Sequence, residues 1–299
     1  MDGIRVSNSQ VYDKNHAILR FYTDDYSKLT MLKYCRLPGY EEPMDSKRKR
    51  NSAGYDSKLG SSFSRARRTV FELAMCNPWE YFVTLTLSPV NGDRQDLKAF
   101  QRKLSNWLKN TNYRQGCAIK YLLIPEPHAD GSWHMHGLFM GIPEDMLRPF
   151  SSTEHLPYKL LEELQKGHVL YDWPGYRDRF GFVTCDPIRD CEACAKYITK
   201  YITKELGESA ARLNQKLYLC SLGLNRSVVA CRGHLGEKFE PDFFNEYVAV
   251  KAFDSLDEPL QLFEVGDSSV GFVDVTGISQ TASWRVERRD GKWILLDGA

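Results

Sequence analysis

The sequence of 299 residues lacks several features that would place it in a common class. No apolar run approaches the ~18–20 residues of a membrane-spanning helix, and residues 1–15 lack the apolar core of a signal peptide. We therefore expect an intracellular, cytoplasmic protein without a membrane partner. No G-x-x-x-x-G-K-[ST] motif occurs, which excludes a P-loop motor in this chain. Eight cysteines in a chain of this length do not indicate a disulfide framework, and we expect thiols.

Net charge is also nearly absent, at +1, but the charge is unevenly distributed. Residues 46–68 are strongly basic, whereas residues 252–299 carry more acidic than basic side chains. The densest part of the basic stretch comprises Lys47, Arg48, Lys49 and Arg50. A solvated linker is one explanation of such a run, and a surface for an anionic partner is the other.

Hydrophobic periodicity predicts alternating strands and helices in the middle of the chain. We expect strands at 81–88, 118–126, 133–140 and 179–185. We expect helices from Asp93, as the N-cap, to a turn at 110–112, over 157–166 and over 190–206. The order favours an α+β fold with an antiparallel central sheet and helices packed on it.

The pattern changes after residue 239 to short β-like runs at 246–253, 260–265, 270–275, 283–288 and 292–296. Asp290-Gly291 is a hairpin signal between the last two runs. We therefore divide the chain into an N-terminal segment with the basic run (1–64), a central domain (65–238) and a small β-rich C-terminal module (239–299).

Glu126, His134 and His136 form the first candidate site. Side chains two apart on a strand share a face, so the two imidazoles point the same way. The hairpin through Asp130-Gly131 brings Glu126 alongside. Two nitrogens and a carboxylate suit a divalent cation with open positions, most plausibly Mg²⁺ or Mn²⁺ if the substrate oxygen belongs to a phosphate. His128, in the loop, is a rival third ligand.

A tandem YITK repeat, residues 197–204, forms the second candidate site. Tyr197 and Tyr201 are four residues apart and share one stripe of the predicted helix, flanked by Lys200 and Lys204. Nearby cations favour a nucleophilic phenolate, whose unperturbed pKa is near 10. An amphipathic helix with tyrosines at its margin is the plainer interpretation of the same pattern.

Cys191 and Cys194 form a CxxC pair without a second pair at zinc spacing. Both fall on the predicted buried stripe with Ala195, Ile198 and Ile202, so core packing is the favoured interpretation. Cys185 nearby keeps a structural metal as the alternative.

FVTLTLS (residues 82–88), Glu126 with HMH (134–136) and YITKYITK (197–204) together resemble the three ordered motifs of the HUH endonuclease superfamily. The closer similarity is to rolling-circle replication initiators of bacterial plasmids and bacteriophages. CNPWEY (76–81) and SLGLNR (221–226) also look like bacterial and prophage initiators. The resemblance covers about residues 65–235.

The resemblance implies a specific activity. The protein would nick and rejoin single-stranded or melted origin DNA in a bacterial cytoplasm. Glu126, His134 and His136 would hold Mg²⁺ or Mn²⁺. Tyr197 or Tyr201, assisted by Lys200 and Lys204, would form a 5′-phosphotyrosyl bond and free a 3′-hydroxyl. A host helicase and polymerase would be partners, because the chain has no P-loop motor.

Several points stay open in the sequence. If His128 is the third ligand, the site resembles that of mobilisation relaxases. A relaxase or single-strand transposase would share the chemistry, whereas a non-catalytic origin-binding protein would form no adduct. The basic run Lys47–Arg50 would contact phosphates. Trp107, Tyr113 and Trp133 are candidates for stacking unpaired bases, although core burial is favoured for Trp107.

Overall fold

The computed structural model describes residues 12–36, 55–203, 206, 216–263, 275–279, 282–289 and 292–297. The chain divides into two compact units. Ala53–Leu224 form one, which we call the central unit, and Met1–Ser52 with Asn225–Ala299 form the other, which we call the terminal unit. This division differs from the three consecutive segments predicted, because strands near both ends of the chain pair with each other.

A seven-stranded antiparallel sheet forms the middle of the central unit, with strand order β6-β7-β8-β3-β5-β4-β9. Its long strands are β3 (Tyr81–Thr86), β4 (Lys120–Pro127), β5 (Trp133–Met140) and β8 (Val183–Pro187). The short ones are β6 (Arg148–Pro149), β7 (Tyr171–Asp172) and β9 (Leu219–Cys220). The predicted antiparallel α+β fold is confirmed, with the HMH strand β5 between β3 and β4.

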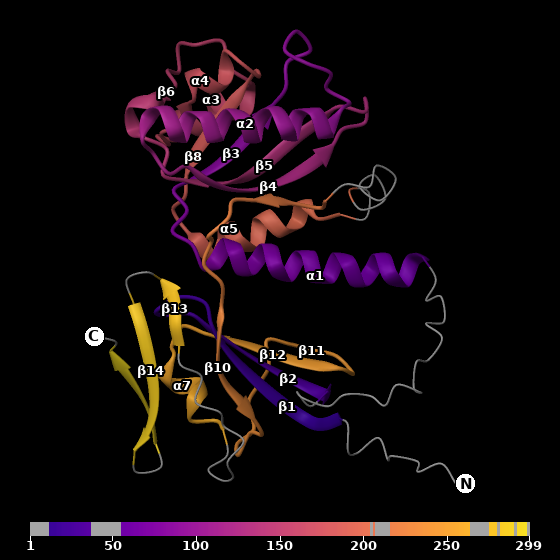
Figure 1. Cartoon of the computed structure of the whole chain (residues 1–299), viewed down its shortest axis with the longest axis vertical. Coiled ribbons are helices and arrows are strands. Elements are labelled where there is room, and N and C mark those ends of the chain that lie inside the picture. The colour runs from indigo at the N-terminus through magenta and orange to yellow at the C-terminus, as the bar shows by residue number, and fades with distance from the viewer. Residues whose placement is uncertain are drawn as a thin grey trace. The chain divides into compact units, whose positions relative to one another are not determined.

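Helices cover both faces of this sheet. Figure 1 shows α2 (Leu97–Gln115) on one side, and α5 (Cys191–Ile198) with α1 (Tyr55–Met75) on the other. The remaining helices are α3 (Tyr158–Gln165), α4 (Pro174–Arg177), and the 3₁₀ turns η3 (Glu144–Met146) and η4 (Thr199–Tyr201). On the α2 side, an aromatic cluster packs on buried Phe139 of β5. Its contacts include Trp107–Trp173 and Phe139–Trp173, with ring centroids 5.0 and 5.8 Å apart.

The first predicted helix differs from α2 at both ends. Asp96, and not Asp93, caps it, because its side chain accepts a hydrogen bond from the Ala99 amide. Asp93 instead accepts from the Gln95 amide, one turn earlier. The predicted turn at 110–112 is helical, and α2 ends at Gly116, whose positive φ of 63° suits glycine.

Two other boundaries were also wrong. The strand predicted to begin at Arg179 begins at Val183, because α4 and the turn behind it bury Tyr176 and Phe180 in the aromatic cluster. The helix predicted over 190–206 is regular only to Ile198 and then tightens into η4. Its predicted N-terminus is confirmed by the Asp190 side chain, which accepts from the Ala193 amide.

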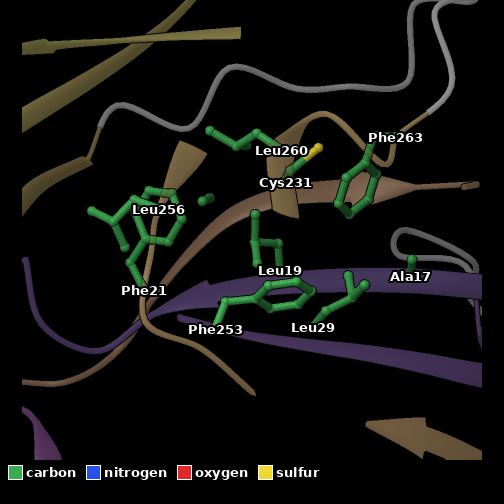
Figure 2. Packing of buried hydrophobic residues seen from close by; sticks show 10 residues of the cluster. Ala17, Leu19, Phe21, Leu29, Cys231, Phe253, Leu256, Leu260 and Phe263 are labelled. Carbon is green, nitrogen blue, oxygen red and sulfur yellow. The ribbon is translucent and has the colours of Figure 1, made fainter. Parts of the chain in front are cut away.

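The terminal unit contains a five-stranded antiparallel sheet of order β10-β1-β2-β12-β11. Its strands are β1 (Tyr12–Phe21), β2 (Ser27–Arg36), β10 (Val228–Gly233), β11 (Phe243–Phe244) and β12 (Val248–Phe253). Figure 2 shows Leu19, Leu29 and Phe253 on one side of the sheet, packed with Leu256 and with Leu260 of the short helix α7 (Asp257–Leu260). Neither β1 nor β2 was predicted.

The region predicted as a β-rich C-terminal module is rich in strands. It includes β11, β12 and the separate three-stranded sheet of β13 (Val275–Ser279), β14 (Ala282–Arg289) and β15 (Lys292–Asp297). However, β12 pairs with β2, so part of this region shares a sheet with the N-terminal strands. The strand predicted at 260–265 is wrong at its start, because Leu260 ends α7. The predicted strand at 270–274 and the turn at 290–291 lie outside the described residues.

Candidate active site

The register of β3, β4 and β5 gathers the first set of predicted residues on one face of the sheet. Glu126 lies opposite His134, Ile124 lies opposite His136, and Thr84 lies opposite His136. Directly opposed residues of antiparallel strands project to the same side. The i, i+2 spacing of the histidines therefore does what the sequence predicted, and β3 contributes a threonine to the same face.

His136 is held at both ring nitrogens. Its Nε2 lies 2.7 Å from Glu126 Oε2, and its Nδ1 lies 3.2 Å from Thr84 Oγ1. In the neutral ring, an Nε2 proton donated to the carboxylate leaves Nδ1 to accept from the threonine hydroxyl. The imidazole is thus fixed in orientation by one carboxylate and one hydroxyl.

His128 and His134 stack on each other near the same carboxylate. Their ring centroids are 3.9 Å apart, and His128 Nε2 lies 3.8 Å from Glu126 Oε2. Glu126 therefore lies within reach of His136 and of the rival ligand His128. Within the described ranges, no three His, Cys, Asp or Glu side chains already converge as a metal-binding group. Glu126 and His136 are engaged with each other instead.

Burial sets the charge state of the two predicted histidine ligands. It lowers the pKa of His134 to about 4, assisted by the positive charge that His128 and His136 carry when protonated. Burial also lowers the pKa of His136, against the opposing effect of the hydrogen bond with Glu126. Both rings are neutral at pH 7, which is the form that offers a nitrogen lone pair to a cation. Two neutral imidazoles and a carboxylate on one face suit the donor set of a divalent metal.

Tyr197 and Tyr201 lie directly over this face. Their phenol oxygens are 3.0 Å apart, and both rings contact Phe82 of β3, with centroids 5.5 and 6.4 Å away. The Tyr201 ring stacks on His136 at 4.2 Å with an angle of 15° between the planes. The two constellations that are far apart in the sequence therefore form one site.

The two tyrosines differ in exposure. Tyr197 is 45% exposed, whereas Tyr201 is half-buried beneath it. Burial raises the pKa of Tyr201 well above its usual value, and the hydrogen bond with Tyr197 adds to that shift. Lys200 Nζ lies 5.4 Å from the centre of the Tyr197 ring. Lys204 lies outside the described residues.

Two clefts meet at the exposed tyrosine. The larger, of about 790 Å³, lies beside Phe82, Thr184 and Arg189. The smaller, of about 510 Å³, lies beside Glu126 and Tyr201. Tyr197 and Lys200 line both clefts. The pair can therefore contact an extended ligand that passes from one cleft to the other.

The tyrosine segment is anchored from below by apolar residues. Ala195, Ile198 and Ile202 are fully buried, as the stripe predicted. Arg67 of α1 donates two hydrogen bonds to the carbonyl oxygen of Ile202, from Nε at 3.0 Å and from Nη2 at 2.8 Å. This carbonyl follows η4, where helix ends leave acceptors without intrahelical partners.

The CxxC prediction is partly wrong. Cys194 is half-buried, and burial raises the pKa of its thiol to about 12, but Cys191 is exposed. Cys191 begins α5 directly after the cap, where the helix has not yet met the sheet. None of the eight cysteines, all in described parts of the chain, forms a disulfide.

The predicted DNA contacts have mixed outcomes. Lys47, Arg48, Lys49 and Arg50 lie outside the described residues. Trp107 packs in the aromatic cluster, as favoured. Trp133 is buried and donates its indole N–H to the Gln95 carbonyl oxygen, so it does not offer a stacking face. Tyr113 is 90% exposed.

Sequence reasoning missed two residues that shape the site. Thr84 was inside the quoted FVTLTLS motif, and its alternation with buried Val83 and Leu85 was the available signal for its direction. Arg67 was counted among the basic residues, but its contact with Ile202 spans 135 positions and leaves no local signal.

Comparison with known proteins agrees with this site. Residues 80–206 match the model of a family of replication-associated proteins of the ORF2 type. The match runs from the start of β3 to just beyond η4 and so contains every described residue of the candidate site. It supports a replication initiator of the Rep type, a class that acts on DNA. No curated protein and no solved structure gives a match. Among the described helices, none has the length and apolarity needed to cross a membrane.

Proposed function

We propose that this protein initiates rolling-circle replication by nicking and rejoining one strand of origin DNA through a tyrosine nucleophile. The observation that carries the proposal is the stacking of Tyr201 on His136, with Tyr197 hydrogen-bonded to Tyr201. It joins a phenol pair to a histidine–carboxylate group inside the region that matches a replication-associated family. This combination supports phosphoryl transfer, because it offers a nucleophile beside donors for a metal.

Glu126, His134 and His136 would hold Mg²⁺ or Mn²⁺, with His128 as the rival third ligand. The cation would polarise the scissile phosphate and stabilise charge on the leaving oxygen. Binding would require the Glu126 carboxylate to turn from the His136 N–H toward the metal. Thr84 would then orient the His136 ring through Nδ1, as outer-shell partners of metal-bound histidines do.

Tyr197 would act first. It is the more exposed phenol and lines both clefts, so a strand crossing from cleft to cleft would pass its hydroxyl. Burial keeps the proton on Tyr201, which would therefore donate the hydrogen bond and leave the Tyr197 oxygen as acceptor. A donated hydrogen bond and the nearby Lys200 both stabilise a Tyr197 phenolate.

In the reaction, the Tyr197 oxygen loses its proton and forms a bond to the scissile phosphorus. The bond from phosphorus to the 3′-oxygen breaks, and that oxygen takes up a proton. The products are a 5′-phosphotyrosyl adduct and a free 3′-hydroxyl that can prime synthesis. Tyr201 would attack the regenerated origin later, and Lys204 would assist it as Lys200 assists Tyr197.

This function would place the protein in the cytoplasm of a bacterial host of a plasmid or phage. A host helicase and polymerase would complete the replication machinery, since the chain has no P-loop motif. The basic run Lys47–Arg50 would add phosphate contacts to origin DNA.

A product assay tests the proposal. Supercoiled DNA of the protein's own replicon is incubated with the protein and Mn²⁺, digested with protease and analysed at the nick. We expect a 3′ end that DNA polymerase extends and a 5′ end that kinase cannot label, because a tyrosyl peptide blocks it. His136→Ala should abolish the nick, whereas the exposed control His155→Ala should not. A nick with a free 5′-phosphate would contradict the tyrosine mechanism.

Mobilisation relaxases are the second candidate, favoured by the position of His128 beside His134 and Glu126. His128→Ala separates the two cases. Loss of metal binding in this variant would favour a three-histidine site, whereas loss only in Glu126→Gln would favour the initiator-type ligand set.

A further inference from the structure

The five-stranded sheet of the terminal unit has one buried and one open face. Ala17, Leu19, Leu29 and Phe253 lie on the buried face, each at 5% exposure or less, and Figure 2 shows them beneath Leu256 and Leu260. The opposite face comprises the residues that alternate with these along each strand. None of its described side chains is buried.

Cross-strand register defines the open face across all five strands. One row runs Arg232–Ile18–Thr30–Val250–Phe243, from β10 at one edge to β11 at the other. The next row along β1 and β2 pairs Arg20 with Lys28. Further along the same strands, Lys14 lies opposite Tyr34.

The charge of this face has one sign. Its basic residues are Lys14, Arg20, Lys28 and Arg232, and the described strand positions that point the same way include no Asp or Glu. Arg20 and Lys28 lie directly opposite each other, an arrangement of like charges that disfavours the sheet unless an anion is near. The net charge of the whole chain is only +1, so this local excess is a property of the face.

Exposed aromatic side chains gather at the same sheet. Tyr34, Phe243, Phe244 and Tyr247 are all more than half exposed. Tyr34 and Phe243 belong to the open face, and the Tyr247 carbonyl oxygen accepts from the Lys33 amide, next to Tyr34. Flat aromatic rings beside cations on an open sheet suit unpaired bases, which stack on the rings while their phosphates meet the charges.

We propose that the open face of the terminal unit binds single-stranded DNA. The inference rests on the proposed function in taking DNA as the ligand, but it concerns a unit that contains no residue of the candidate active site. Phosphates would contact Arg20, Lys28 and Arg232, and bases would stack on Tyr34 and Phe243. The terminal unit would thus retain the displaced or melted strand independently of the covalent bond.

Fluorescence anisotropy of the full chain tests this inference. The probe is a labelled oligothymidine of about 16 nucleotides, the upper site size of one small single-strand-binding module. EDTA is present throughout, so that no metal-dependent nicking contributes. The variants are Arg20→Gln/Lys28→Gln and the matched control Lys238→Gln/Lys251→Gln. The control removes the same charge from an exposed loop and from the buried-face side, where Lys251 pairs with Leu29.

We expect the open-face pair to weaken binding about tenfold or more and to flatten the salt dependence. The slope should fall by about 0.7 for each lost phosphate contact, and so by about 1.4 for the pair. Tyr34→Leu/Phe243→Leu should weaken binding by a similar factor with an unchanged slope, because stacking carries no charge. Circular dichroism checks that each variant is folded.

Equal affinity and slope for the open-face pair and its control would overturn the inference. A preference of the wild-type chain for duplex of the same length, lost in the open-face pair, would overturn the single-strand assignment. Neither result would bear on the nicking chemistry, because the assay contains no metal. Conversely, failure of the nicking assay would leave this binding measurement intact.

Discussion

The guanidinium of Arg67 is bonded through two nitrogens to the backbone carbonyl oxygen of Ile202, one residue after Tyr201. Arg67 belongs to α1, whereas the carbonyl ends the 3₁₀ turn that carries Tyr201. Because this turn follows the regular part of α5, its geometry depends on an external donor. The contact therefore links a helix outside the sheet to the position of the nucleophile segment.

Replacing Arg67 tests that link. Arg67→Ala should lower the free energy of unfolding by about 1–3 kcal/mol, the range for hydrogen bonds to charged groups. It should also reduce nicking more than DNA binding, because the tyrosines lose their support. Arg68→Ala is the control, since it removes the same charge about 100° around the helix. Equal effects of both variants on nicking would contradict the positioning role.

Thr84 should matter through His136. Thr84→Val removes the hydroxyl 3.2 Å from Nδ1 with little change in volume. We expect Mn²⁺ affinity, measured by isothermal titration calorimetry, to fall about 10–100-fold, as when outer-shell partners of metal ligands are lost. The exposed substitution Thr153→Val should leave it unchanged. Wild-type affinity in Thr84→Val would remove Thr84 from the account.

Gly137 tests the close approach of β4 and β5. A methyl group at this position would collide with the backbone oxygen of Leu122 and lie 2.6 Å from Leu123 Cδ2. Gly137→Ala should therefore destabilise the chain by about 1–3 kcal/mol, as overpacking does, because the obstacle is backbone. Gly92→Ala, which meets only the Leu87 side chain at 3.5 Å, is the matched control in thermal denaturation. Indistinguishable melting temperatures would mean that the strands lie farther apart.

Acid should weaken a polar cluster at the far edge of the sheet. Arg148 contacts Glu154 at 2.9 Å and Asp172 at 3.3 Å. The hydrogen bond from Arg148, with one from the Ser151 amide, lowers the pKa of Glu154 from 4.5 to about 2. The folded pKa is depressed, so the stabilisation is present above pH 4.5 and is lost as the pH falls toward 2.

Denaturant unfolding at several pH values measures this effect. Glu154→Gln should be less stable than wild type above pH 4.5, and the difference should shrink toward pH 2. A constant difference between the two proteins over that range would contradict the assignment.

The sequence predicted the parts of the site that depend on local periodicity. The i, i+2 histidines, the hairpin that returns Glu126 to His134, and the i, i+4 tyrosines all follow from strand and helix repeats. It did not predict β1 and β2, because these pair with β10 and β12, about two hundred residues away, and their pairing leaves no local pattern. The end of α5 was missed for the same reason, since a distant arginine holds the carbonyl at which it stops.

The most direct test of the central claim is a denaturing-gel measurement of covalent DNA attachment. The protein is incubated with Mn²⁺ and end-labelled single-stranded DNA from its own replicon, and compared with Tyr197→Phe, Tyr201→Phe and the double variant. The account predicts a metal-dependent adduct on the fragment 3′ to the nick, strongly reduced in Tyr197→Phe and absent in the double variant. An adduct that survives in the double variant, or tight DNA binding without any adduct across the replicon, would contradict it.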